Sequence, residues 1–195
     1  LSFADRKILN DVSFTIDQKT RAALAGANGC GKSTLLKVIT GIIPADGINI
    51  SKTKGITVSY LPQADILLPQ KSVYEVAEEG YDKYKALVNE YEEIAKELDG
   101  IGQQDKYSHI LSRMNEINEI LDDVGYYHRR SRIEQILQGL GFKMSDLSSP
   151  SSTFSGGWQM RIALARILVE DPDILLLDEP TNYPDIDAMV WLKNY

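Results

Sequence analysis

The sequence predicts an α/β protein with a mostly parallel sheet and an inserted antiparallel helical hairpin. A short apolar run, residues 21–25, leads into a glycine-rich loop and then a helical pattern at residues 32–40. A second apolar run, residues 174–177, is continuous, as in strands buried in the middle of a parallel sheet. Between them, residues 84–124 place apolar side chains at spacings of three and four, which is typical of packed helices.

The composition is that of an ordinary soluble globular protein. Of its 195 residues, 43% are hydrophobic and 25% are charged. No apolar run approaches the roughly 20 residues that cross a bilayer, and no signal segment opens the chain, so we expect a cytoplasmic protein without a membrane span. The single cysteine, Cys30, excludes an intramolecular disulfide, and the two histidines are too few for a metal cluster. Because the chain starts without methionine and stops inside a helical pattern, we also expect it to be part of a longer protein.

The negative charge is concentrated in one internal segment. Residues 72–148 hold 9 Lys and Arg against 16 Asp and Glu, whereas the rest of the chain is balanced at 12 against 12. An acidic segment binds phosphate poorly, so non-specific nucleic-acid binding is not expected of this chain alone.

The first part of the chain predicts strands and one helix. Residues 8–16 alternate and are rich in β-formers, residues 21–25 give a second strand, and residues 56–61 give a third. The helix at residues 32–40 ends before Gly41. Strand, glycine loop and helix, in this order, are the context that a phosphate-binding loop requires.

Two helices with one shared apolar seam are predicted next. The break between them, residues 99–104, is polar and contains glycines, so the helices should run antiparallel. A third helix is expected to begin at Ser131, which has capping-box spacing to Glu134, and to end near Gly139 or Gly141. The tyrosines of the seam are interpreted as packing residues, with base stacking as the alternative. The seam residues are Tyr84, Val88, Tyr91, Ala95 and Leu98, then Tyr107, Ile110, Met114, Ile117, Leu121 and Val124.

The glycine-rich loop matches the phosphate-loop pattern in full. Its glycines let backbone N–H groups surround the β-phosphate, Lys32 places a positive charge on the β and γ oxygens, and the Ser33 hydroxyl is a hard ligand for Mg²⁺. The helix start adds its positive end, and Thr34 can reach the α-phosphate. Cys30 is expected to be a small buried spacer; the alternative is a reactive thiol whose alkylation blocks nucleotide binding. The sequence therefore predicts that ATP with Mg²⁺ binds to Gly26, Ala27, Asn28, Gly29, Cys30, Gly31, Lys32, Ser33 and Thr34.

An acidic pair follows the predicted strand at residues 174–177. Asp178 and Glu179 should lie at the C-terminal end of this strand, where parallel sheets hold their ligands. We expect Asp178 to hold the Mg²⁺, directly or through water, and Glu179 to orient and deprotonate the attacking water. Taken alone, such a pair is more often a solvated turn, but the phosphate loop favours the catalytic role.

A second anion-binding helix start is predicted further along the chain, at Ser155, Gly156 and Gly157, followed by Trp158 and Gln159. Together with the phosphate loop and the acidic pair, it resembles the nucleotide-binding domain of the ATP-binding-cassette (ABC) superfamily over residues 2–195. This resemblance implies a P-loop NTPase core of ABC type with an antiparallel β subdomain. It also implies that the Ser-Gly-Gly signature acts on a nucleotide held by a partner cassette.

The resemblance gives roles to three further residues. Phe3 lies where the family stacks an aromatic ring on adenine, with a plain core phenylalanine as the alternative. Gln63 matches the glutamine that contacts the Mg²⁺ and the attacking water, and Asp185 matches the aspartate of the loop that crosses the dimer interface. Tyr183 and Pro184 stand where the family usually has histidine and leucine, which puts the geometry of that loop in doubt.

Two features resemble the ABC-F branch of the superfamily. The signature reads Ser-Gly-Gly-Trp-Gln, and a helical hairpin lies between Gln63 and the signature. ABC-F proteins carry two cassettes on one chain and act on the ribosome. The resemblance therefore implies a second cassette, in the same full-length chain or in a homodimer, and contact with ribosome, rRNA or tRNA. We expect residues 1–72 and 149–195 to form the ATPase core and residues 73–148 the helical subdomain, with the arm at about 73–124.

Two other functions stay open. An ATPase subunit of a membrane transporter would use the region after Gln63 to dock a membrane domain. A nucleotide-gated binding module with weak hydrolysis is favoured by Tyr183 and Pro184 and opposed by Glu179. Alone, the chain should bind Mg-ATP yet hydrolyse it poorly, because no partner signature faces its phosphate loop.

Overall fold

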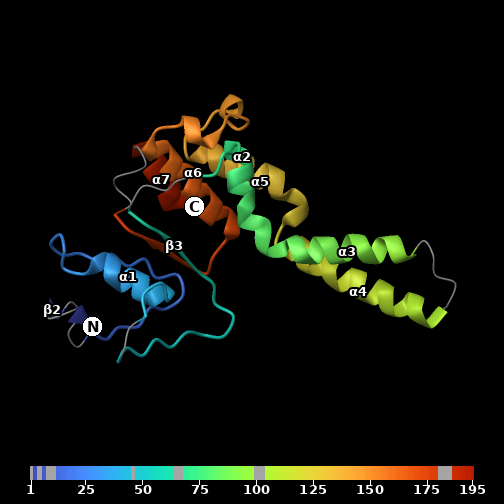
Figure 1. Ribbon diagram of the computed structural model, residues 1–195, viewed down its shortest axis with the longest axis horizontal. Helices are drawn as coiled ribbons and strands as arrows, with labels where there is room; N and C mark the ends of the chain where they lie inside the picture. Colours follow the sequence, from blue (N-terminus) through green and yellow to red (C-terminus); the bar gives the residue numbers. More distant parts are fainter. Residues whose placement is uncertain are drawn as a thin grey trace. The chain divides into compact units, whose positions relative to one another are not determined.

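The chain folds into two compact units in the computed structural model (Figure 1). Unit 1 comprises Leu1–Ala64 and Pro172–Pro180, and unit 2 comprises Asp65–Asp171 and Thr181–Tyr195. The division into core and helical subdomain that the sequence suggests stays a prediction. The structure describes residues 2–3, 6–7, 12–44, 47–63, 68–98, 104–179 and 186–195.

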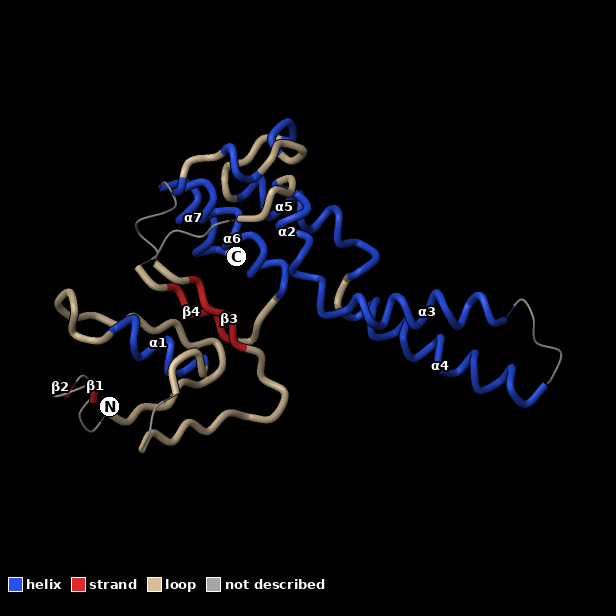
Figure 2. The backbone as a smooth tube through the Cα atoms, viewed as in Figure 1, coloured by secondary structure: helices blue, strands red, loops and turns tan. Residues whose placement is uncertain are grey.

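Unit 1 contains two short sheets and one helix. β1 (Ser2–Phe3) and β2 (Arg6–Lys7) pair antiparallel, and α1 spans Lys32–Thr40. β3 (Val58–Leu61) and β4 (Ile174–Leu177) pair parallel, from Val58 opposite Ile174 to Leu61 opposite Leu177 (Figure 2). In this register the two strands end level with each other, so the residues that follow them emerge at one edge of the pair.

Side-chain hydrogen bonds fix the register at the other end of the pair. The Thr57 backbone N–H and hydroxyl both donate to Asp173 Oδ2, at 2.8 and 2.8 Å. The Asp173 N–H donates back to the Thr57 hydroxyl at 3.0 Å. These bonds satisfy backbone and side-chain groups just before each strand begins, so the parallel pair starts at a defined residue.

Two predicted strands differ from the structure. Residues 21–25 and the described part of 8–16, residues 12–16, belong to no strand or helix. Val12, Phe14 and Ile16 are accordingly exposed, at 55%, 53% and 44%. A strand is stabilised by ladder hydrogen bonds and by packing on one face, and no described strand lies beside these residues to supply them. Both strand predictions are therefore wrong for the described residues.

Unit 2 is helical and is built around one buried helix, α6 (Gly156–Glu170). Its residues 160–165 and 167–169 are buried. α2 (Val73–Glu78) and α5 (Arg129–Gly139) pack against α6 and bring fully buried aliphatic side chains to it. α7 (Ile186–Asn194) packs against α5, and the ring of Trp191 occupies the space beside Gly139 that a Cβ atom would fill.

The predicted antiparallel helix pair is present in unit 2. α3 (Lys85–Leu98) and α4 (Gln104–Asp123) lie side by side (Figure 1). Arg113 Nε and Nη2 donate to the two oxygens of Glu90 at 2.7 and 2.9 Å, which joins the helices across their polar face. Of the predicted seam, Ile117 and Leu121 are buried, and the side chains of Leu98 and Tyr107 lie outside those described. Whether the pair is an inserted arm stays a prediction.

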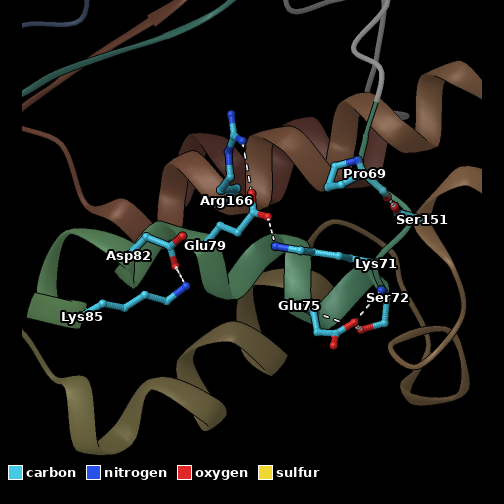
Figure 3. Close-up of polar contacts among 9 residues, drawn as sticks. All are labelled: Pro69, Lys71, Ser72, Glu75, Glu79, Asp82, Lys85, Ser151 and Arg166. Atoms are coloured by element: carbon cyan, nitrogen blue, oxygen red, sulfur yellow. Dashed lines mark hydrogen bonds and ion pairs between the residues drawn. The ribbon is translucent and has the colours of Figure 1, made fainter. Parts of the chain in front are cut away.

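The helix pair is joined to the rest of unit 2 by short 3₁₀ helices. η1 (Glu79–Tyr84) leads into α3, and η2 (Tyr126–His128) follows α4. Two further 3₁₀ helices, η3 (Met144–Asp146) and η4 (Ser151–Thr153), precede α6 and do not contribute to this junction. η1 crosses α6 closely at Gly80, where a Cβ atom would lie 2.6 Å from a backbone oxygen. Glu79 joins two cations at this crossing, Lys71 at 2.7 Å and Arg166 at 3.5 Å (Figure 3).

The capping box of unit 2 lies on a different helix from the one predicted. The Ser72 hydroxyl accepts from the Glu75 N–H at 3.2 Å, and Glu75 accepts from the Ser72 N–H at 2.8 Å, so the box opens α2 (Figure 3). The hydrogen bond from the Ser72 backbone lowers the pKa of the Glu75 carboxyl. The predicted box at Ser131 is wrong: Ser131 lies inside α5, and Glu134 accepts from Arg130 instead.

Candidate functional site

The phosphate loop ends at the first residue of α1, as the sequence predicts. Gly31 is the N-cap residue of α1, with φ of 100°, and no side chain caps the helix. Gly29 also has positive φ, 76°, a conformation that costs little only for glycine. The first N–H groups of an α-helix lack partners within the helix. They are therefore available to a ligand at this end of α1.

The Lys32 ammonium lies over the loop that precedes it. Lys32 Nζ donates to the backbone oxygens of Gly26 at 3.0 Å and Ala27 at 3.1 Å. The Cys30 N–H donates to Ala27 at 3.3 Å and closes the turn, which contains Asn28 and Gly29. The two carbonyl oxygens thus hold the Lys32 ammonium at the loop. From there the ammonium can donate its hydrogen bonds to the oxygens of a bound anion instead. Ser33 and Thr34 follow in the first turn of α1 and are half-buried.

The Cys30 side chain lies close to Gly26 and is more exposed than the sequence predicts. A Cβ atom on Gly26 would lie 2.7 Å from Cys30 Sγ, closer than side chains pack, so a larger residue at this position would require the Cys30 thiol to move. The Cys30 side chain itself is exposed. The expectation of a buried spacer is therefore wrong.

The carboxyl ends of β3 and β4 bring three predicted residues to one edge. Gln63 follows β3, and Asp178 and Glu179 follow β4 directly. Gln63 Nε2 donates to Glu179 Oε2 in a short contact. Glu179 has φ of 50°, which is uncommon for a residue with a Cβ atom. Two side chains 116 residues apart in the sequence are in this way held together.

Asp178 is the buried carboxylate of this edge. It is 4% exposed, its N–H donates to the Leu61 oxygen at 3.1 Å, and its Oδ2 accepts from the Tyr60 hydroxyl at 3.0 Å. A buried carboxylate is costly unless it is hydrogen-bonded. The sequence does not indicate this role of Tyr60, because the residue lies within a strand, 118 residues from its partner, and no local pattern marks it.

The Ser-Gly-Gly signature opens α6 in unit 2. Ser155 is the N-cap residue, in an extended conformation and without a side-chain capping bond. Ser155, Gly156 and Gly157 are exposed, and a Cβ atom on Gly157 would have no neighbour within 4 Å. Gln159 Nε2 donates to the Phe154 oxygen at 2.8 Å and ties the turn to the preceding residue. The helix start therefore offers uncapped N–H groups at an open surface.

The side chains of two predicted site residues lie outside those that the structure describes. The backbone of Phe3 belongs to β1, but its side chain is not among those described, and Asp185 lies outside the described residues together with Tyr183 and Pro184. Among the described residues, no group of three or more His, Cys, Asp or Glu side chains could hold a metal ion. No described helix is long and apolar enough to cross a membrane.

Comparisons with known proteins agree on one family. The sequence profile of the family described as ABC transporter matches residues 9–182. Among curated relatives, the uncharacterized ABC transporter ATP-binding protein YfmM of Bacillus subtilis is 36% identical and aligns over 99% of this chain and 37% of its own length. ABC transporter F family member 5 of Arabidopsis thaliana is 32% identical, over 100% of this chain and 28% of its own length.

Further matches agree with the family and the fold. The ATP-binding protein Uup of Haemophilus influenzae is 36% identical, over 100% of this chain and 29% of its own length. This chain thus spans about a third of the length of these relatives, which include ABC-F family members. An inward-facing structure of an ABC transporter of metal-chelate type has a TM-score of 0.55 at 21% identity, covering 93% of this chain and 58% of its own, which supports the fold. The chain belongs to the ABC transporter family and is an ATP-binding ABC domain.

Proposed function

We propose that this chain is a cassette of ABC-F type, which binds Mg-ATP and, together with a second cassette, hydrolyses it in a cycle coupled to the ribosome. The contact between Gln63 and Glu179 carries the hydrolytic part of this proposal. It joins the two side chains that hydrolysis requires beside a buried carboxylate, Asp178, at the edge where parallel sheets bind ligands.

ATP binding rests on the loop at the start of α1. The uncapped N–H groups of α1 and the glycines with positive φ can face the phosphates. The Lys32 ammonium would exchange its two carbonyl acceptors for the β and γ oxygens, which gives stronger charge-assisted hydrogen bonds. The phosphates thus gain both backbone dipoles and one full positive charge.

Three oxygen-bearing side chains of unit 1 fit Mg²⁺. The ion prefers hard oxygen ligands and keeps several waters and phosphate oxygens, so it needs only one or two protein ligands. The Asp178 carboxylate is buried and held by Tyr60, and Ser33 presents its hydroxyl in the first turn of α1. Ser33 and Asp178, with Gln63 at the same strand edge as Asp178, would hold the ion. Bound there, Mg²⁺ would neutralise charge on the β and γ phosphates.

Glu179 is the proposed general base. Its carboxylate would accept a proton from the attacking water, and Gln63 would hold both the carboxylate and the water in place. The positive φ of Glu179 is consistent with a functional constraint, because such a conformation costs about 1–3 kcal/mol and is retained mainly where the surrounding structure requires it.

The opposite wall of the site is proposed to come from a second cassette. The exposed start of α6, at Ser155, Gly156 and Gly157, would contact the γ-phosphate bound by the partner's loop. Since this chain offers one loop and one signature, the isolated chain should bind Mg-ATP. It should hydrolyse ATP far below the rate of ~1–100 per second that is typical of phosphoryl transfer enzymes. Steady-state release of phosphate by this chain alone, at a typical rate, would contradict the proposal.

The ABC-F assignment, a ribosomal partner and a cytoplasmic location rest on the relatives and on the signature with Trp158. The alternative is the ATP-binding subunit of a membrane transporter, which agrees with the names of the Bacillus subtilis and Arabidopsis thaliana relatives as ABC transporter proteins. A nucleotide-gated module with weak hydrolysis is disfavoured by the contact between Glu179 and Gln63.

Glu179→Gln in the full-length protein separates these functions. The amide keeps the size of the side chain but cannot accept the proton, so the ATP-bound state should persist. An ABC-F protein should then sediment with ribosomes when ATP is present, whereas a transporter subunit should sediment with membranes. The double variant with Lys32→Ala is the control, because loss of ATP binding should abolish ribosome trapping.

A further inference from the structure

The first turn of α6 is open on its outer side and tightly packed on its inner side. Ser155, Gly156 and Gly157 are exposed, whereas Trp158 turns its ring into unit 2. The rings of Trp158 and Phe142 pack edge to face, at a centroid distance of 4.8 Å and an interplanar angle of 74°, and the centroid of the Phe154 ring lies 6.3 Å from that of Trp158. Trp158 is therefore the packing residue that holds the turn carrying the signature.

Arg161 adds to this packing by stacking on the indole of Trp158. Its guanidinium carbon lies 4.3 Å from the centroid of the Trp158 ring, one helical turn further along α6. Arg161 is only 7% exposed, and Nη1 donates to the Leu140 oxygen at 3.2 Å. The arginine thus links the first turn of α6 to the turn that ends α5.

Gly141 makes room for this link. It has φ of 94°, and a Cβ atom there would lie 3.2 Å from Arg161 Nη1 and 3.6 Å from the Trp158 ring. Both the left-handed conformation and the close approach favour glycine at this position. The turn after α5 is therefore shaped around the guanidinium and the indole together.

We propose that Arg161 is a positioning residue for the signature. By stacking on Trp158 and bonding to Leu140, it fixes the direction in which the N–H groups of Gly156 and Gly157 point. The inference rests on the proposed function, in which these groups contact a nucleotide held by the partner cassette. N–H donors contribute most when their direction is set before the ligand arrives.

The planar guanidinium is needed for both contacts. It can lie flat on an aromatic ring while its N–H groups donate in the plane, whereas a lysine ammonium cannot do both from one position. Arg161→Lys should therefore lose most of the positioning, and Arg161→Met, which keeps the volume of the stem, should lose it as well. Arg166→Met is the matched control: Arg166 lies on the same helix but faces Glu79.

The positional claim is tested by fluorescence in this chain. It has two tryptophans, so Trp191→Phe leaves Trp158 as the single reporter. Arg161→Met and Arg161→Lys should shift the Trp158 emission to the red and increase its quenching by acrylamide, whereas Arg166→Met should change neither. An unchanged emission in folded Arg161→Lys, or an equal change in Arg166→Met, overturns the inference. If Arg161→Met does not fold, Arg161→Lys decides.

The functional claim is tested in the full-length protein. With loss of a desolvated cation–π contact and of one charged hydrogen bond, we expect kcat for ATP to fall about tenfold or more in Arg161→Lys. The Kd for ATP at the phosphate loop should stay within about twofold, because that loop lies on a different wall of the site. An unchanged kcat overturns the inference, as does a loss of ATP affinity equal to the loss of kcat.

A separate variant shows which proposal has failed. If Lys32→Ala leaves ATP hydrolysis unchanged, the proposed function fails, and with it the role of Arg161 in hydrolysis. If Lys32→Ala abolishes hydrolysis while Arg161→Lys is fully active, only the inference on Arg161 fails.

Discussion

The hydrogen bond from Tyr60 to Asp178 makes a quantitative prediction about the strand edge. Tyr60→Phe removes the hydroxyl that donates to Asp178 Oδ2 at 3.0 Å and keeps the ring. Asp178 is 4% exposed, so water cannot readily replace the lost donor. A hydrogen bond to a charged group contributes about 1.5–3 kcal/mol to stability. We therefore expect the free energy of unfolding to fall by about 1.5–3 kcal/mol.

Urea denaturation of a double-mutant cycle measures this bond directly. In an Asp178→Asn background the hydroxyl faces a neutral partner, and Tyr60→Phe should cost only about 1 kcal/mol. The interaction between the two substitutions should therefore be about 1 kcal/mol. Tyr84→Phe is the control, since the described residues offer its hydroxyl no hydrogen-bond partner; it should change stability by less than about 0.5 kcal/mol. The argument is refuted if Tyr60→Phe costs the same in both backgrounds.

Two further predictions concern unit 2. Gly80→Ala should lower the free energy of unfolding by about 1–3 kcal/mol or more, because the added Cβ atom overpacks against α6. Gly157→Ala is the control and should have little effect, because the space around Gly157 is open. Equal melting temperatures of the two variants would contradict this prediction. The hydrogen bond from Arg113 holds the pKa of the Glu90 carboxyl below its ordinary value. This pair therefore stabilises the fold fully above the unfolded-state pKa, and the contribution is lost as the pH falls from there through the folded-state pKa. Glu90→Gln should accordingly lower the melting temperature at neutral pH, and the difference from the parent should shrink below about pH 4; a difference independent of pH would count against the ion pair.

Local signals predicted the elements on which the site rests. Lys32–Thr40 and Ile174–Leu177 form the predicted helix and strand without a shift, because the glycines before α1 and the continuous apolar run of β4 are each sufficient locally. Glu179 follows β4 directly, as the predicted strand implies, whereas its contact with Gln63 is a finding of the structure, because the sequence identifies Gln63 only through the family resemblance. Their roles in catalysis stay predictions.

Structural features that depend on contacts between residues distant in the sequence could not be predicted from one sequence. Ser131 has the spacing of a capping box, but tertiary packing extends α5 back to Arg129 and leaves the serine inside the helix. Tyr60 carries no local pattern, because the carboxylate that it contacts lies 118 residues away. Arg161 stacks on the nearby Trp158, but its hydrogen bond to the Leu140 oxygen joins residues 21 apart, and no pattern in the sequence indicates it. The exposure of Cys30 likewise depends on how the loop turns in space.

Equilibrium binding of Mg-ATP to this chain tests the central claim most directly. Isothermal titration should show one site in the parent and in Lys37→Ala, a lysine in the last turn of the same helix. Lys32→Ala should weaken binding at least about tenfold, because the phosphates lose a charge-assisted donor. An affinity that is unchanged in Lys32→Ala, or no binding by the parent chain, would contradict the assignment of the loop at α1 as the ATP site.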